Sequence, residues 1–259
     1  MSVDSSTAAI HQPLDYWSDS TRPLASLAMV APFLVAYEAG VLLLGSGAIR
    51  NGADVWLRTW LDLAGLGQYF LLPVLVCGIL LAWHHARRDA WRIDRRVLGA
   101  MWLEAVALGL ALLVLAQLQA RLLAGFCDPA PVAALATGPA ALAARACGYC
   151  GAGIYEELLF RLLLLSPAIA LLRWVGMNRT YSLGCAIAAT SLAFAAAHYR
   201  FELSLFGWQI GLPHGDEFTW FSFLFRATAG SVFALVFALR GFGIAVAAHA
   251  IYDLLVLAI

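Results

Sequence analysis

The sequence is poor in charge and contains no lysine. Only 12% of its 259 residues are charged, whereas a soluble domain carries about 25%. The 16 basic residues are all arginine, and 16 acidic residues balance them, so the formal net charge is zero. This balance argues against the basic surface that binds nucleic acid, and we expect no nucleic-acid partner.

Hydrophobic residues make up 63% of the chain, and the mean hydropathy is +0.82. A membrane-spanning helix needs about 20 mostly apolar residues. About seven segments approach this requirement, namely 24–44, 67–83, 98–125, 146–172, 181–198, 218–239 and 242–258. The fold class we predict is therefore all-α, a polytopic membrane protein. Segment 132–144 is also apolar, and is either a loop or the start of the fourth helix.

Segment 50–68 predicts a further helix that lies at the membrane interface. Trp56, Leu57 and Trp60 fall near one helical face, and tryptophan is typical of the headgroup level. Arg58 and Asp62 are spaced to pair along the same helix. The first 21 residues are polar, and no signal peptide is evident among them.

Arginine distribution predicts the orientation. Five arginines lie in the short segment 84–96, which we expect to face the cytoplasm. With seven spans, the N-terminus is then inside and the C-terminus outside. We expect a multi-pass integral protein of a bacterial inner (plasma) membrane, with the lipid bilayer as its surroundings.

Ionisable side chains within spans cost about 2.5–3.5 kcal/mol each, so each needs a partner or a wet cavity. For Glu38, Glu104 and Arg226, the expected explanation is interhelical pairing or a place near the lipid headgroups. Cys147 and Cys150 form a CxxC motif. On a membrane helix, this spacing favours close packing over a redox or metal role.

The last third of the chain differs, because its polar residues follow helical registers. Glu157 and Arg161 are four residues apart, so they share a face and can form an ion pair. Glu156 points about 100° away from that face. Phe194 and His198 have the same four-residue spacing.

His249 and Asp253 repeat this spacing on the last helix. Three helices thus offer a carboxylate, an imidazole and an imidazole–carboxylate pair. No serine or cysteine has a nucleophile context such as GxSxG. Glu156 and His198 can instead activate a water, while His249 stabilises an oxyanion and is oriented by Asp253.

The ordered motifs EExxxR, FxxxH and HxxxD resemble those of the CPBP family, which comprises the type II CAAX prenyl proteases and the bacteriocin-processing (Abi) membrane proteins. The resemblance covers about 151–259 and implies a glutamate-dependent intramembrane endopeptidase. It implies that Glu156 is the general base, that His198 is its partner, and that His249 and Asp253 form the oxyanion site. Glu157 and Arg161 would be mainly structural. We expect no metal and no cofactor.

One residue departs from the family pattern. Prenyl proteases of the family commonly have asparagine at the last motif position, where this chain has Asp253. An ionised aspartate cannot donate a hydrogen bond, so it either fixes the tautomer of His249 or is held protonated.

We divide the chain into a polar segment 1–23, membrane helices without a recognised motif in 24–145, and a catalytic helical core in 146–259. The expected substrate is a membrane-associated or lipid-modified protein or peptide. Three alternatives stay open. The same residues could bind zinc as Glu156, His198 and His249, serve a transporter or proton relay, or belong to a non-catalytic scaffold or immunity protein.

Overall fold

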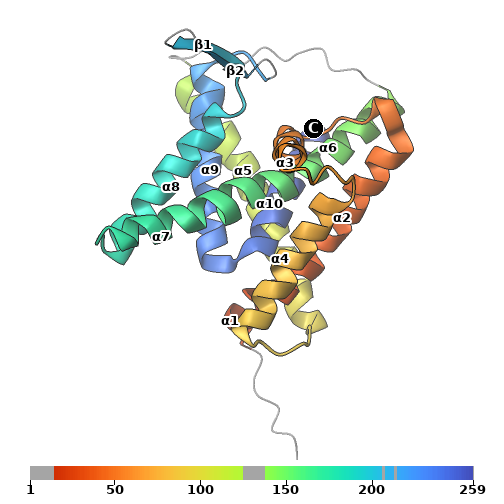
Figure 1. Ribbon diagram of the computed structural model, residues 1–259, viewed down its shortest axis with the longest axis vertical. Coiled ribbons are helices and arrows are strands. Elements are labelled where there is room, and N and C mark those ends of the chain that lie inside the picture. Colours follow the sequence, from red (N-terminus) through yellow and green to blue (C-terminus); the bar gives the residue numbers. More distant parts are fainter. Residues whose placement is uncertain (1–14, 125–137, 206–207, 213–214, 259) are drawn as a thin grey trace, which may run out of the picture.

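The computed structural model describes residues 15–124, 138–205, 208–212 and 215–258. It is a helical bundle with one short hairpin at an end (Figure 1). The elements in chain order are α1 (Tyr16–Ser20), α2 (Pro23–Leu44), η1 (Gly45–Gly47), α3 (Gly52–Leu63), α4 (Leu71–Arg87), α5 (Arg95–Leu123), α6 (Pro139–Glu157), η2 (Leu158–Leu165), α7 (Ser166–Trp174), α8 (Arg179–Ala196), β1 (Phe201–Leu205), β2 (Trp208–Leu212), α9 (Trp220–Arg240) and α10 (Phe242–Ala258).

The helices confirm the predicted all-α membrane architecture. Helices α2, α5 and α9 are long and apolar enough to cross a bilayer, and α4 and α10 are shorter apolar helices. The other two predicted spans coincide with α8 and with the continuous helix formed by α6, η2 and α7. The predicted interfacial helix is α3. Segments 1–14 and 125–137 lie outside the described residues, so for 132–144 the structure describes only the start of α6 at Pro139.

The hairpin between α8 and α9 was not expected from the sequence. Strands β1 and β2 pair antiparallel, with Phe201 opposite Leu212 and Leu205 opposite Trp208. This short hairpin is the departure of the described chain from a purely helical fold. Strand β1 begins three residues after His198, so the hairpin lies at the end of the bundle at which α8 stops (Figure 1).

Helix α10 lies at the centre of the bundle, where it packs against α2, α5, α6 and α9. Its small residues Ala245, Ala247 and Ala248 are fully buried. A Cβ atom on Gly153 of α6 would lie 2.8 Å from the Cβ of Ala250. Small residues therefore let α6 and α10 approach closely.

Glu38, Glu104 and Arg226 are all paired, and for Glu38 and Glu104 the partners lie on other helices, as predicted. The carboxylate of Glu104 accepts two hydrogen bonds from Arg240, at 2.6 and 2.9 Å, and another from Tyr16. Glu38 accepts from the Tyr155 hydroxyl at 2.6 Å. Arg226 pairs with Asp216 in the segment just before its own helix α9 (Trp220–Arg240), so this pair is not interhelical.

The predicted pairing of Arg58 with Asp62 on α3 is wrong. Arg58 Nε lies 2.6 Å from Asp54 Oδ1 instead, because Asp54 is on the face of α3 that the bundle buries. The thiols of Cys147 and Cys150 are free and buried. Cys147 packs against α2, where its Sγ donates to the Tyr37 carbonyl at 3.4 Å.

Candidate active site

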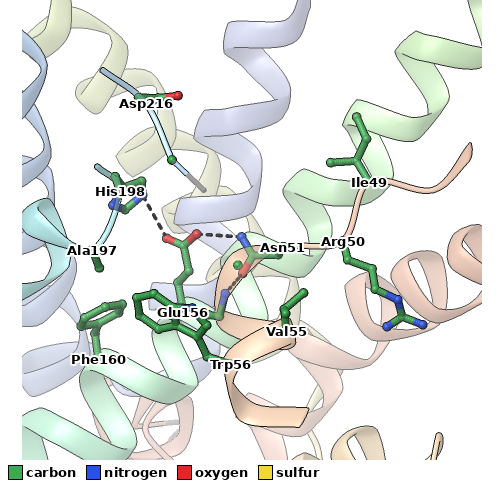
Figure 2. Close-up of a pocket in the computed structure, with 13 residues that line it drawn as sticks. Ile49, Arg50, Asn51, Val55, Trp56, Glu156, Phe160, Ala197, His198 and Asp216 are labelled. Atoms are coloured by element: carbon green, nitrogen blue, oxygen red, sulfur yellow. Dashed lines mark hydrogen bonds and ion pairs between the residues drawn. The ribbon is translucent and has the colours of Figure 1, made fainter. Parts of the chain in front are cut away.

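Three helices bring Glu156, His198 and His249 together. Glu156 lies at the end of α6, His198 follows the end of α8, and His249 lies within α10. Glu156 Oε2 is 3.6 Å from His198 Nε2 and 3.9 Å from His249 Nε2. The predicted convergence is therefore present, at distances longer than direct hydrogen bonds. Figure 2 shows Glu156 and His198 facing each other across the site.

Two contacts with Phe194 fix the orientation of the His198 ring. Its Nδ1 lies 2.7 Å from the carbonyl oxygen of Phe194. A carbonyl can only accept, so Nδ1 carries the proton and Nε2 of the neutral ring presents a lone pair to Glu156. The Phe194 ring packs against the imidazole at a centroid distance of 4.8 Å. The FxxxH spacing thus supplies both a backbone acceptor and a packing surface for the histidine.

His249 is held in the same manner by Glu157. Its Nδ1 lies 2.8 Å from Glu157 Oε1, and its ring stacks on Phe233 at 4.4 Å. A carboxylate only accepts when ionised, so Nδ1–H donates to Glu157, and Nε2 points toward Glu156. The sequence assigned this orienting role to Asp253, but Glu157 makes the shorter contact.

Glu157 is shared between His249 and Arg161. Arg161 Nε lies 3.0 Å from Glu157 Oε2, which confirms the predicted ion pair, and both side chains are almost fully buried. Arg161 also donates to the Gly230 carbonyl on α9 at 3.2 Å and lies over the Phe194 ring. The pair therefore links α6, α9 and α10 behind the two histidines.

A π-helical stretch, η2, begins directly after Glu157 and contains Arg161. Its wider turn is seen in the backbone N–H of Ser166, which donates to the Arg161 carbonyl five residues earlier. Such π segments are rare and concentrate at functional sites. The sequence gave no sign of it, because Leu158–Leu165 has the apolar composition of an ordinary span.

Asp253 lies near Nε2 of His249, whereas Glu157 contacts Nδ1. Its Oδ2 is 3.6 Å from His249 Nε2. Three carboxylates therefore surround the His249 imidazole, from Glu156, Glu157 and Asp253.

Sequence reasoning missed one polar contact to Glu156. The side-chain amide of Asn51 donates to Glu156 Oε1 at 2.8 Å, as the dashed line in Figure 2 marks. Asn51 precedes α3 and lies 105 positions from Glu156. The sequence offered one indication of a role for Asn51. It lies at the start of the predicted interfacial helix, and asparagine is a common N-cap residue at that position.

A cavity of about 630 Å³ opens onto Glu156 and His198. The residues that line it come from the loop before α3 and from α3 itself, from α6 and η2, and from the segment around the hairpin. They are Ile49, Arg50, Asn51, Gly52, Ala53, Val55, Trp56, Glu156, Phe160, Ala197, His198, Gly215 and Asp216. Apolar side chains such as Trp56, Val55 and Phe160 thus meet a few polar groups, a pattern typical of ligand sites.

Metal binding was weighed for the same residues. Within the described part of the chain, no group of three or more histidine, cysteine, aspartate or glutamate side chains has an arrangement suited to a metal ion. The oxygen and two nitrogens that face one another lie 3.6 and 3.9 Å apart, and a shared ligand between them can be a water molecule as readily as an ion.

Comparison with known proteins identifies one family. Residues 138–255 match the family model described as Type II CAAX prenyl endopeptidase Rce1-like. No curated protein and no solved structure matches the chain. The matched range contains all six residues singled out in the sequence, while Asn51 and α3 lie outside it.

Proposed function

Because residues 138–255 match the family model of the type II CAAX prenyl endopeptidases, we propose that this membrane protein hydrolyses a peptide bond within the bilayer, with Glu156 and His198 as the pair that activates water. The observation that carries the proposal is the spacing of Glu156 Oε2 and His198 Nε2, at 3.6 Å. Two acceptors at this separation are stabilised by a donor between them, and one water supplies two protons.

The geometry suggests how such a water reacts. With its protons directed at Glu156 and His198, the lone pair of the water oxygen is free to attack a substrate carbonyl in the cavity. As the water oxygen attacks the carbonyl carbon, the C–O bond forms, one proton passes to the Glu156–His198 pair, and the carbonyl π electrons move to the oxygen of a tetrahedral oxyanion. The same pair returns the proton to the departing amine as the C–N bond breaks.

His249 is assigned to the oxyanion. Its Nδ1–H is already donated to Glu157, so only Nε2–H of the protonated ring can reach the substrate oxygen. The three surrounding carboxylates support that charged form. Glu157 and Arg161 then act by position, because they orient His249 and anchor the helix that carries Glu156. Asp253 contributes charge beside Nε2.

The substrate class follows from the setting. The cavity is lined by Trp56, Val55 and Phe160 and opens beside the interfacial helix, which favours a polypeptide that reaches the site from the membrane surface with an apolar or lipid-bearing segment. The family description supports a prenylated carboxyl-terminal peptide as the first substrate to assay. A bacterial inner membrane is the location we propose.

The decisive experiment is cleavage by purified Glu156→Gln protein. The assay substrate is an internally quenched peptide with a farnesylated cysteine near its carboxyl end. Removing the base is expected to lower kcat by about 10²–10⁴-fold, the usual contribution of general base catalysis, while thermal unfolding in detergent changes little. Undiminished cleavage by Glu156→Gln would contradict the proposal.

A metal-assisted version of the same hydrolysis predicts a different outcome in one assay. The proposed mechanism needs no metal ion, so activity should survive exhaustive treatment with EDTA and 1,10-phenanthroline. Loss of activity that added zinc restores would favour the metal-dependent alternative.

A further inference from the structure

We propose that Asn51 is a positioning residue that holds the carboxylate of Glu156 in its reactive orientation, an inference that rests on the proposed function. Its side-chain Nδ2 donates to Glu156 Oε1 at 2.8 Å. The other carboxylate oxygen, Oε2, then faces the two imidazoles. Asn51 therefore decides which oxygen of Glu156 is occupied and which is free for water.

The direction of the Asn51 amide is fixed by a second contact. Its Oδ1 accepts a hydrogen bond from the backbone N–H of Ala53 at 2.8 Å, as the N-cap of α3. A backbone N–H can only donate, so the oxygen must point to Ala53 and the NH₂ group must point to Glu156. The Asn51 side chain thus caps the start of α3 and also binds the proposed base.

The backbone of Asn51 is anchored in turn. Its N–H donates to the Tyr37 hydroxyl at 3.4 Å, and that hydroxyl donates to Asp54 at 2.8 Å. Asp54 is fully buried and also binds Arg50 and Arg58, at 2.9 and 2.6 Å. This network ties the start of α3 to α2, so Asn51 is held firmly enough to orient its partner.

The contact joins the two halves of the chain. Glu156 lies inside the matched family domain, whereas Asn51 lies in the helices before it. A hydrogen bond from a neutral donor to an ionised carboxylate is worth more than one between neutral groups. The first half of the chain thereby contributes to the state of the catalytic carboxylate.

Two variants separate this role from helix capping. Asn51→Ser keeps a good N-cap residue but is too short to reach Glu156. Asn51→Asp also keeps a cap, and it places a second carboxylate against the first. We expect kcat for the farnesylated quenched peptide to fall by about 10- to 100-fold in Asn51→Ser, as for the loss of a hydrogen bond to a charged group. The fall should be larger in Asn51→Asp, and KM should change little in either variant.

Asn178→Ser is the matched control. Asn178 is also an N-cap, with its Oδ1 accepting from Tyr181 at 3.0 Å, but it is exposed and begins α8 at the end opposite His198. A capping role alone would lower the melting temperature equally in both serine variants and leave kcat intact. That pattern would overturn the inference.

A second measurement does not depend on turnover. Dicyclohexylcarbodiimide modifies protonated carboxyl groups in apolar surroundings, and mass spectrometry locates the product, with Glu156→Gln as the blank. Without the donor from Asn51, Glu156 is protonated more often, so Asn51→Ser should label faster at neutral pH than wild type or Asn178→Ser. Equal labelling would refute the Asn51 contact even if Glu156 proves catalytic. Faster labelling would support it even if Glu156→Gln still cleaves the peptide and the proposed function fails.

Discussion

The carboxylates of Glu104 and Glu156 both lie among apolar helices, but their partners stand at different distances. Glu104 is held by Arg240 at 2.6 and 2.9 Å, and Ser20 binds the same guanidinium at 3.0 Å. Glu156 Oε2 has its imidazole neighbours at 3.6 and 3.9 Å. Direct contact neutralises a buried charge and leaves no acceptor for chemistry, whereas the longer spacing keeps one oxygen available.

The Glu157–Arg161 pair is intermediate between the cases of Glu104 and Glu156. Glu157 and Arg161 are in direct contact, as Glu104 and Arg240 are, yet they touch the site through His249. The comparison therefore separates a charge pair that stabilises the fold from the carboxylate that we propose acts on substrate, and from a pair that would serve both purposes.

The largest expected effect comes from Arg161→Met. It leaves Glu157 buried without its guanidinium, and breaking such a pair costs about 3–5 kcal/mol. We expect a much lower melting temperature in detergent and poor recovery of protein. Arg173→Met, which removes an exposed arginine from α7, should unfold like the wild type. Equal melting of the two variants would mean that the Glu157–Arg161 pair does not support the fold.

His249→Gln should act on turnover more than on stability. The glutamine amide can still donate to Glu157 but cannot at the same time supply the donor at Nε2. Loss of an oxyanion donor lowers kcat by about 10²–10³-fold, measured with the farnesylated peptide at saturating concentration. A change confined to KM would instead place His249 in substrate binding.

Arg240→Met tests the closed pair at Glu104. It removes two charge-assisted hydrogen bonds that are partly accessible, so unfolding should become easier by about 1.5–3 kcal/mol. Adding Glu104→Gln should recover part of this loss, because the orphaned charge is then gone. The kcat of both variants should equal that of the wild type, and a fall in kcat at unchanged stability would erase the distinction between the two regions.

Asp253→Asn should have the smallest effect. Asparagine offers an N–H donor beside His249 Nε2 but takes away a carboxylate that favours the protonated ring. These changes oppose each other, each about one hydrogen bond in size, so we expect kcat to change by less than about tenfold. A loss comparable with that of His249→Gln would make Asp253 indispensable to the oxyanion site.

Helical periodicity predicted much of this structure because the relevant contacts are local. Glu157 and Arg161 are four residues apart and do pair, and the apolar runs became helices. The three motifs also placed Glu156, His198 and His249 on separate helices that meet. Such inference succeeds where a single helix face determines the neighbours of a side chain.

The contacts that the sequence did not predict depend on long-range packing. The contact between Asn51 and Glu156 joins positions 105 residues apart, and nothing in either local pattern encodes it. Asp253 was expected to orient His249 because it is close in sequence, but Glu157 from another helix lies closer in space. The hairpin and the π turn were missed because their segments have the composition of ordinary spans or loops.

The continuous helix that carries Glu156 bears on the lipid around it. Its three parts, α6, η2 and α7, have 19, 8 and 9 residues and follow one another without a break. At about 1.5 Å per residue the rod is about 50 Å long, while the hydrocarbon layer is about 30 Å thick. It runs obliquely across the bundle (Figure 1), and Glu156 lies near its middle. A rod this long must tilt, extend beyond the hydrocarbon layer or distort the bilayer, and local thinning there would shorten the path of water and headgroups to the site that we propose.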